Sequence, residues 1–216
     1  MLLILLFCVS VTACNSTEQG SLFKYDIEAD PLNLDPQSAE DYPSLLVIQN
    51  IFEGLLTVNP DGTLGEGVAT DWSRSDNGLQ YTFSLRKDAK WFDGEPVTAN
   101  DFVFAFQRAL DPATGSNDVH DLFQIKNAKE IWQQKAEANT LGAVALDSYT
   151  LKITLESSDE NFPYRTVKAV YMPCNQAFFE QTKGRYGMTY ETSCTNGPFG
   201  FVNLYSWEER KSMNFC

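Results

Sequence analysis

The chain has 216 residues, of which 16 are basic and 29 acidic, so its formal net charge at pH 7 is −13. Such an acidic surface disfavours a role on nucleic acid or on an anionic membrane surface, because both repel negative charge. Apolar residues make up 43% of the chain and aromatic residues 13%, far above the composition of disordered proteins. The sequence therefore predicts a soluble body with a hydrophobic core.

The N-terminus carries the pattern of a lipoprotein signal peptide. Residues 2–11 form a short, mostly apolar run that leads into Val-Thr-Ala-Cys at residues 11–14. The run falls well short of the roughly 20 apolar residues that a transmembrane helix requires. Large side chains precede Cys8, whereas small ones precede Cys14, as the signal peptidase requires. We predict that residues 1–14 hold the signal peptide and that Cys14 becomes the lipidated first residue, which two or more acyl chains anchor stably.

The first elements of the body follow a short linker. Residues 15–20 are polar and predict that linker. Residues 22–27 predict a strand, because every second side chain is apolar or aromatic. Pro43 is typical of a first helical turn, and we expect a helix from there to about Gly54. The apolar residues that share one face of this helix are Leu45, Ile48, Phe52 and Leu55.

A β-rich section comes after this helix. Residues 59–62 (Asn-Pro-Asp-Gly) and 76–78 (Asp-Asn-Gly) are turn signals. The second turn leads into residues 81–85, where Tyr, Phe and Leu alternate with Thr and Ser, the pattern of a half-buried strand. Residues 142–146 and 151–155 predict a hairpin, since Leu, Ile and Leu alternate with Lys and Thr in its second strand.

Two more helices are predicted between these strands. Thr98 and Asp101 resemble an N-terminal cap, ahead of a helix that ends at Asp111 and Pro112. The apolar residues of this helix are Phe102, Phe106, Ala109 and Leu110. A further helix is expected over roughly residues 121–135. Because strands and helices mix throughout, the predicted fold class is α/β.

Residues 50–64 (NIFEGLLTVNPDGTL) form the most informative run of the chain. Together with residues 68–72, 81–86 and 89–103, this run resembles the signature of solute-binding protein family 5. Members of that family are extracytoplasmic receptors that hand oligopeptides, dipeptides or nickel to ABC importers. The resemblance extends from about Asp35 to the C-terminus.

This resemblance implies a type II periplasmic-binding-protein-like fold, in which two lobes enclose the ligand. It places the N-terminal part of the large lobe at residues 21–47, a β-rich α/β subdomain at residues 48–168 and a return to the large lobe at residues 169–216. Residues 197–207 hold Gly-Pro-Phe and then a strand, and residues 212–215 begin a partner strand that would leave an open edge. We therefore expect an incomplete chain, the N-terminal fragment with the first lobe and its subdomain but without the second lobe.

The same resemblance implies where a ligand binds. Family members pair the peptide main chain with an extended segment after the Leu-Asp-Pro of residues 34–36, and that segment is here Glu40, Asp41 and Tyr42. Pro43 has no N–H group, so the pairing must end before it. The alternative for this segment is a solvated loop in which Asp41 caps the following helix.

The ligand class stays open at this point. Several peptide-binding members place an aromatic residue after the Asp-Pro of residues 111–112, and none is evident at residues 117–120. The predicted function is the capture of oligopeptides for an ABC permease and its ATPase, without chemistry, by a protein lipid-anchored on the extracellular or periplasmic side of the membrane. The alternatives are nickel or another small solute and, from a different class, an exported carboxylate-dependent hydrolase.

Cys174 and Cys194 remain as candidates for a disulfide bond after the signal-peptide cysteines and Cys216 are set aside. Such bonds form in exported proteins. The resemblance implies that the segment after residues 171–173 lies close to the segment before residues 196–198, which brings the two sulfur atoms within bonding reach.

No enzyme, metal site or cofactor is predicted. His120 is the only histidine, so it offers neither a histidine-rich metal site nor a secure Ser/His/Asp triad, and we expect it on the surface or at a helix start. The aspartates lack the spacing of a calcium loop, and no phosphate-binding glycine loop or HExxH motif occurs. Only the receptor function explains the lipoprotein signal together with the family signature.

Overall fold

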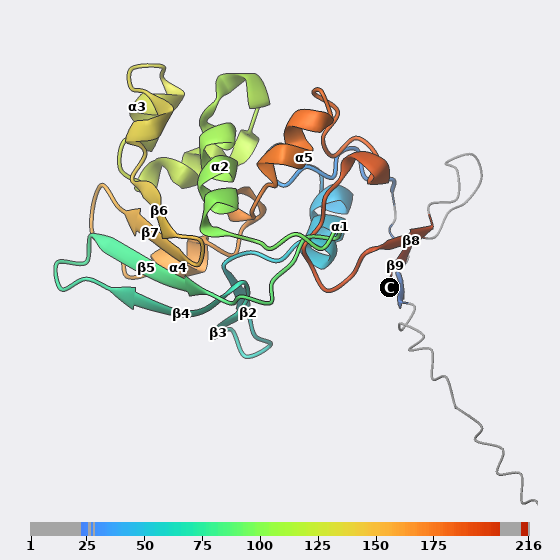
Figure 1. The fold of residues 1–216 in the computed structure, drawn as a ribbon, viewed down its shortest axis with the longest axis horizontal. Coiled ribbons are helices and arrows are strands. Elements are labelled where there is room, and N and C mark those ends of the chain that lie inside the picture. The colour runs from blue at the N-terminus through green and yellow to red at the C-terminus, as the bar shows by residue number, and fades with distance from the viewer. Residues whose placement is uncertain (1–22, 26, 28, 204–212, 216) are drawn as a thin grey trace, which may run out of the picture.

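A four-stranded antiparallel sheet in the order β4-β5-β7-β6 forms one side of the structure (Figure 1). The computed structural model describes residues 23–25, 27, 29–203 and 213–215. The strands of this sheet are β4 (Ala69–Arg74), β5 (Gln80–Leu85), β6 (Ala143–Asp147) and β7 (Thr150–Thr154). The strand predicted after the turn at residues 76–78 and the predicted hairpin are both confirmed.

The sheet buries alternate side chains of β5, as its sequence pattern predicts. Tyr81, Phe83 and Leu85 are buried, and the positions between them are exposed or half-buried. In the register of β5 and β7, Tyr81 lies opposite Ile153 and Phe83 opposite Leu151. Each of these fully buried apolar side chains contributes about 1.5–3 kcal/mol to folding.

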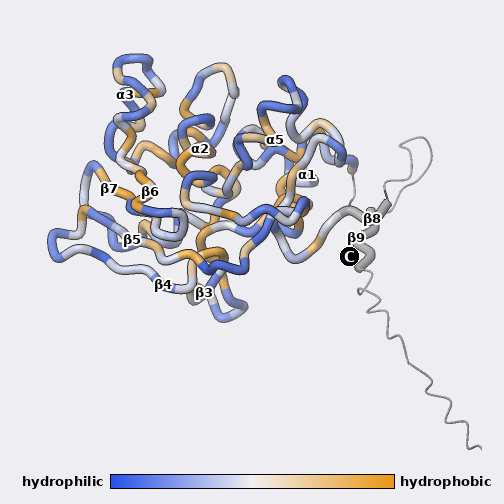
Figure 2. The backbone as a smooth tube through the Cα atoms, in the orientation of Figure 1, coloured by the Kyte–Doolittle hydropathy of each residue, from blue (hydrophilic) through white to orange (hydrophobic). Residues whose placement is uncertain are grey.

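Helix α2 (Ala99–Leu110) packs against β6 and lies over one face of the sheet (Figure 1). The backbone N–H of Thr98 donates to Oδ2 of Asp101 at 2.7 Å, so the predicted cap is confirmed. The predicted apolar residues of this helix are all buried: Phe102, Phe106, Ala109 and Leu110. In Figure 2 the hydrophobic segments gather between α2 and the strands, which places the core there.

Helix α1 (Tyr42–Ile51) is shorter than predicted. It ends at Ile51 instead of Gly54, because Phe52 is already extended, with φ −119° and ψ 152°. The carbonyl of Ile51 accepts a hydrogen bond from the N–H of Gly197 at 2.9 Å. The Asn196 side chain bonds to both the N–H and the carbonyl of Glu53, at 3.1 and 2.9 Å. These contacts with a distant segment pull the chain out of the helix, which a local pattern does not reveal.

The single helix predicted over residues 121–135 is wrong. The structure has a 3₁₀ helix, η2 (Asn117–Gln124), followed by a short α3 (Ala128–Trp132). Ile125 forms an antiparallel bridge with Leu155, and Asn127 adopts a left-handed conformation with φ 63°. Pairing with the residue that directly follows β7 therefore interrupts the helical pattern.

A second, two-stranded hairpin projects from the body (Figure 1). Strands β2 (Leu56–Val58) and β3 (Leu64–Glu66) flank the turn at residues 59–62, which is confirmed by a hydrogen bond from the Gly62 N–H to the Asn59 carbonyl at 2.9 Å. The remaining helices are η1 (Pro112–Thr114), η3 (Ala138–Thr140), α4 (Phe162–Arg165), η4 (Ala169–Tyr171), α5 (Gln176–Gln181) and η5 (Tyr190–Thr192).

The third sheet joins the two ends of the described chain. Its order is β1-β9-β8, with β1 (Phe23–Tyr25), β8 (Phe201–Asn203) and β9 (Met213–Phe215). The predicted pairing of residues 212–215 with the strand after residue 199 is confirmed for β9 and β8. The other side of β9 pairs with β1, so the edge that the sequence left open there is occupied. Cys14, the linker at residues 15–20 and residues 204–207 lie outside the described residues.

Within the described part of the chain, no helix has both the length and the apolar character needed to cross a membrane.

Candidate functional site

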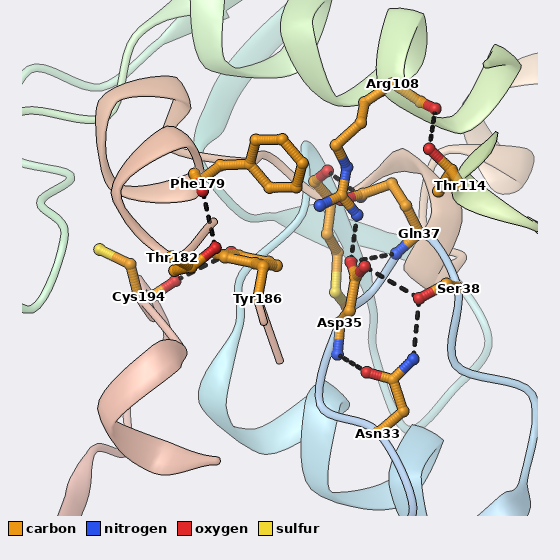
Figure 3. Close-up of polar contacts among 11 residues, drawn as sticks. Asn33, Asp35, Gln37, Ser38, Arg108, Thr114, Phe179, Thr182, Tyr186 and Cys194 are labelled. Atoms are coloured by element: carbon orange, nitrogen blue, oxygen red, sulfur yellow. Dashed lines mark hydrogen bonds and ion pairs between the residues drawn. The ribbon is translucent and has the colours of Figure 1, made fainter. Parts of the chain in front are cut away.

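The turn between β1 and α1 is organised around Asp35 (Figure 3). Oδ2 of Asp35 accepts a hydrogen bond from Oγ of Ser38 at 2.9 Å, and Oδ1 accepts one from the N–H of Gln37 at 3.1 Å. The N–H of Asp35 donates in turn to Oδ1 of Asn33 at 2.9 Å. An aspartate that accepts from the backbone two residues on fixes a tight turn. The backbone of residues 33–38 is therefore held in one conformation.

Arg108 of α2 forms a buried ion pair with Asp35 (Figure 3). Only 5% of the Arg108 side chain and 9% of the Asp35 side chain are exposed. The guanidinium also lies 4.7 Å from the ring centroid of Phe179 and 5.2 Å from that of Tyr186. Burial lowers the pKa of Arg108, but Asp35 and, to a lesser degree, Cys174 and Tyr186 together raise it, so the net shift is upward and the group stays charged. The pair ties three segments together that are far apart in sequence.

Two further contacts connect the turn to its surroundings. Nε2 of Gln37 donates to the carbonyl of Met172 at 2.9 Å, and this bond is buried. The N–H of Asn33 donates to Oγ of Ser44 in α1 at 3.1 Å. The segment between the turn and the helix is thus held at both ends.

That segment is Glu40 to Tyr42, which the sequence predicted as ligand-binding. Asp41 caps α1, because its side chain accepts from the N–H of Ser44 at 2.9 Å, and its backbone is extended with φ −81° and ψ 147°. Tyr42, the first residue of the helix, is 75% exposed. Among the described residues, the N–H groups of Glu40, Asp41 and Tyr42 and the carbonyl of Glu40 have no hydrogen-bond partner. The helix-cap alternative is therefore true of Asp41, and it leaves these main-chain groups free.

The side chain of Glu40 contacts η2. Nδ2 of Asn117 donates to Oε2 of Glu40 on the protein surface. His120 lies exposed in the same 3₁₀ helix, as expected for a surface residue. The free main-chain groups are thus flanked by η2 on one side and by the start of α1 on the other.

A cavity of about 930 Å³ opens beside Arg108. Its walls come from the N-terminal segment, α2, the end of α3 and the loop after α5, and they include Leu32, Phe104, Ile131, Phe179 and Met188. The segment Glu40 to Tyr42 does not line it. No sequence motif indicated this cavity, because its walls come from four separate stretches of chain.

The comparisons with known proteins identify the family. Residues 63–215 match the bacterial extracellular solute-binding proteins, family 5 Middle. This chain belongs to family 5 of the bacterial extracellular solute-binding proteins.

Among its curated relatives, the chain is 42% identical over 159 residues to the periplasmic murein peptide-binding protein MppA of Escherichia coli K12, a match of 73% of this chain and 29% of MppA. It is 32% identical over 223 residues to the oligopeptide-binding protein OppA of Bacillus subtilis, covering 98% of this chain and 40% of OppA. The chain thus spans 29% of the length of the first relative and 40% of the length of the second.

Solved structures of the family show the same fold. The structure of Listeria monocytogenes OppA bound to peptide matches with a TM-score of 0.78 and 32% identity, over 81% of this chain and 35% of that one. The substrate-binding domain of a Bacillus anthracis oligopeptide ABC transporter matches with a TM-score of 0.79 and 34% identity, over 81% and 34%. The predicted family and the type II periplasmic-binding-protein-like α/β fold are confirmed, and this chain covers about a third of that fold.

Two cysteines of this family 5 chain lie within the described residues, and they are not bonded to each other. Cys174 and Cys194 are both buried free thiols, so the predicted disulfide bond is not formed there and stays a prediction for the exported protein. Both lie near Tyr186, whose hydroxyl donates to the carbonyl of Cys194 at 3.4 Å. Burial raises the pKa of each thiol to about 12. Both are therefore protonated at neutral pH.

Metal ligands do not converge in the part of the chain that the structure describes: no three His, Cys, Asp or Glu side chains form a group that could hold an ion.

Sequence reasoning missed the pair of Asp35 and Arg108. A signal was present, because Arg108 is a charged residue between Ala105 and Ala109 on the buried face of α2. A buried cation requires a counter-charge. The sequence does not say which of the many acidic residues supplies it.

Proposed function

We propose that this chain belongs to the extracytoplasmic solute-binding component of an ABC importer, which captures oligopeptides for uptake by a membrane permease and its ATPase. Relatives named as oligopeptide-, dipeptide- and murein peptide-binding proteins support a peptide ligand. The observation that carries the proposal is the segment Glu40 to Tyr42, whose backbone is extended at Asp41 and whose free N–H groups lie beside the free carbonyl of Glu40.

A peptide would bind this segment as an added strand. Main-chain hydrogen bonds do not depend on the side chains of the ligand, so such pairing tolerates many sequences. Each bond exposed to water contributes on the order of 1 kcal/mol. The groups of Glu40, Asp41 and Tyr42 alone therefore support binding no tighter than about millimolar. In the two-lobed protein, closure around the ligand would supply the remaining affinity.

A small solute other than a peptide is the second candidate. One relative, 38% identical over 153 residues, is a probable deoxycholate-binding periplasmic protein of Escherichia coli K12. The family thus takes ligands of more than one chemical class. Nickel has weaker support than a small organic solute, since His120, the only histidine, is in contact with aromatic rings. A hydrolase has the least support, because the relatives carry the names of binding proteins.

We also propose the location and the domain limits that the sequence predicts. Lipid on Cys14 would anchor the protein to the outer face of the cell membrane. The lobe limits at residues 47/48 and 168/169 stay predictions. The Val-Thr-Ala-Cys pattern supports the anchor. The acidic composition of the chain supports a body that does not itself adhere to anionic lipid.

The peptide proposal is tested at a single main-chain group. In Tyr42→Pro the N–H of residue 42 is lost, while proline is tolerated at a first helical position and the extended Asp41 before it already suits an X-Pro bond. Tyr42→Ala is the matched control, since it removes the ring and keeps the N–H. Trialanine added to the ¹⁵N-labelled chain should shift the amide signals of Glu40 and Asp41, with an affinity about fivefold weaker in Tyr42→Pro.

Two results would contradict the proposal. One is equal binding of trialanine by Tyr42→Pro and the unaltered chain, together with weakened binding by Tyr42→Ala, which would assign the segment to side-chain recognition. The other is the absence of any shift at Glu40 to Tyr42 at tens of millimolar peptide.

A further inference from the structure

One face of η2 adjoins the segment Glu40 to Tyr42, which we call the ligand segment, through the contact between Asn117 and Glu40. A 3₁₀ helix has three residues per turn, so side chains three positions apart lie above one another. Val119 and Leu122 form its buried face. Asn117, His120 and Phe123 share another face, on which the first two are exposed and Phe123 is half-buried. The face that contacts Glu40 through Asn117 therefore also carries two aromatic rings.

Trp132 of α3 completes a cluster on this face, which we call the aromatic ledge and which consists of His120, Phe123 and Trp132. The ring centroids of His120 and Phe123 are 4.9 Å apart, those of His120 and Trp132 5.6 Å, and those of Phe123 and Trp132 5.4 Å. All three rings lie within the range of favourable aromatic contact. His120 is exposed and the other two are half-buried, so the ledge offers ring surface to the solvent.

The distance from the ligand segment suits a short peptide. A 3₁₀ helix rises about 2.0 Å per residue, so the path from Asn117 to Phe123 measures about 12 Å. An extended peptide covers about 3.3 Å per residue. A ligand paired with Glu40 to Tyr42 would therefore bring a side chain onto the ledge within three or four residues.

Acidic side chains outnumber basic ones on the elements that carry the ledge, which favours a cation. Asp118 is exposed on η2, Glu40 adjoins Asn117, and Glu130 is exposed on α3. Lys126, between η2 and α3, and Lys129, on α3, are also exposed and oppose a cation, which disfavours a simple point charge more than a group that also stacks. A guanidinium is planar, stacks on aromatic faces and pairs with carboxylates, whereas an ammonium does not stack.

We infer that the aromatic ledge is a side-chain subsite that binds the arginine side chain of a peptide. This inference rests on the proposed function, because it deepens the same ligand site. The expected ligand is a peptide that pairs at one end with Glu40 to Tyr42 and carries an arginine three or four residues from that end.

The experiment uses the 216-residue chain and probes that separate the ledge from the main-chain segment. N-acetyl-arginine amide is titrated while the Trp132 indole N–H signal is followed by NMR, with Trp132→Phe used to assign that signal. N-acetyl-citrulline amide is the uncharged control of the same shape. The arginine probe should shift the indole signal, and the citrulline probe should bind about two- to fivefold more weakly.

Variants test each part of the ledge. His120→Ala removes an exposed ring and should weaken the arginine probe about two- to fivefold. Trp72→Leu is the matched control, because it removes a half-buried tryptophan from β4, outside the ledge, and should leave the affinity unchanged. Equal affinities for arginine and citrulline, no shift of the Trp132 signal, or no effect of His120→Ala would each overturn the inference. Stronger binding of N-acetyl-phenylalanine amide than of the arginine probe would also overturn it, in favour of an aromatic ligand.

Failure of the proposed function looks different in the same experiment. If trialanine leaves the amides of Glu40 to Tyr42 unchanged while the arginine probe still shifts Trp132, the main-chain site fails and the ledge stands as a separate arginine site. If trialanine binds and the arginine probe does not, the ledge alone fails.

Discussion

Replacing Asp35 with asparagine should strongly destabilise the protein. The substitution keeps the shape of the side chain and an acceptor oxygen for Gln37 or Ser38, but it removes the charge that Arg108 faces. The guanidinium would remain buried, with 5% of its side chain exposed. Breaking a buried ion pair from one side costs about 3–5 kcal/mol. Because the rings of Phe179 and Tyr186 still face the cation, we expect the lower end of this range, about 3 kcal/mol.

Urea unfolding of single and double variants provides the measurement. Arg108→Met removes the cation and nearly preserves the volume, so Asp35→Asn combined with Arg108→Met should cost less than the sum of the two single losses, by about 1–3 kcal/mol. Glu160→Gln is the control, since it breaks the exposed pair with Arg74 and should change stability by about 0.5 kcal/mol or less. A loss below about 1 kcal/mol for Asp35→Asn, or additive single losses, would refute the reasoning.

Three further predictions concern cysteines and the half-buried carboxyl group of Asp101. Mass spectrometry of membrane-associated protein from cells should find acyl groups on Cys14, and Cys14→Ala should release or stall the precursor; a mature membrane form that begins at Met1 would contradict this. Under oxidising conditions Cys174 and Cys194 should form a disulfide bond, seen as a loss of two hydrogens in the mass of the protein, and loop closure should stabilise the protein by about 3 kcal/mol. If both thiols can still be alkylated after the protein is unfolded without reductant, the bond is excluded. Burial raises the pKa of Asp101, so its contribution to stability is present below its unfolded pKa and is lost as pH rises through the folded value. Asp101→Asn should reduce the fall of the unfolding free energy as pH rises above about 4, and an unchanged profile would contradict the assignment.

Local patterns predicted the elements whose causes are local. The alternation in β5, the turn at residues 59–62 and the cap at Thr98 each depend on a few neighbouring residues, and each is confirmed. The prediction of a helix over residues 121–135 failed because Ile125 pairs with Leu155, which lies 30 positions away in the chain. A helical period in the sequence does not contain that contact.

The candidate site also contains one feature with a local cause and others that depend on contacts between distant residues. Asp41 before Pro43 predicts a helix cap from residue chemistry alone, and the structure confirms the cap. The ion pair of Asp35 and Arg108 joins residues 73 positions apart, and the contact between Glu40 and Asn117 joins residues 77 positions apart. Such pairings depend on the packing of α2 and η2 against the N-terminal segment, which composition and spacing do not specify.

The buried ion pair and the free main-chain groups of Glu40 to Tyr42 belong to one arrangement. Fixing the backbone of one residue costs about 1–2 kcal/mol of conformational entropy, which a mobile loop would lose only when a ligand binds. Here the turn around Asp35 fixes the segment on one side, and the cap of Asp41 on α1 fixes it on the other. The entropy is therefore lost during folding, and a peptide meets a segment whose backbone is already fixed. Asp35→Asn should consequently weaken trialanine binding even where the chain stays folded, while the affinity of the arginine probe for the aromatic ledge, which η2 and α3 hold, should change less.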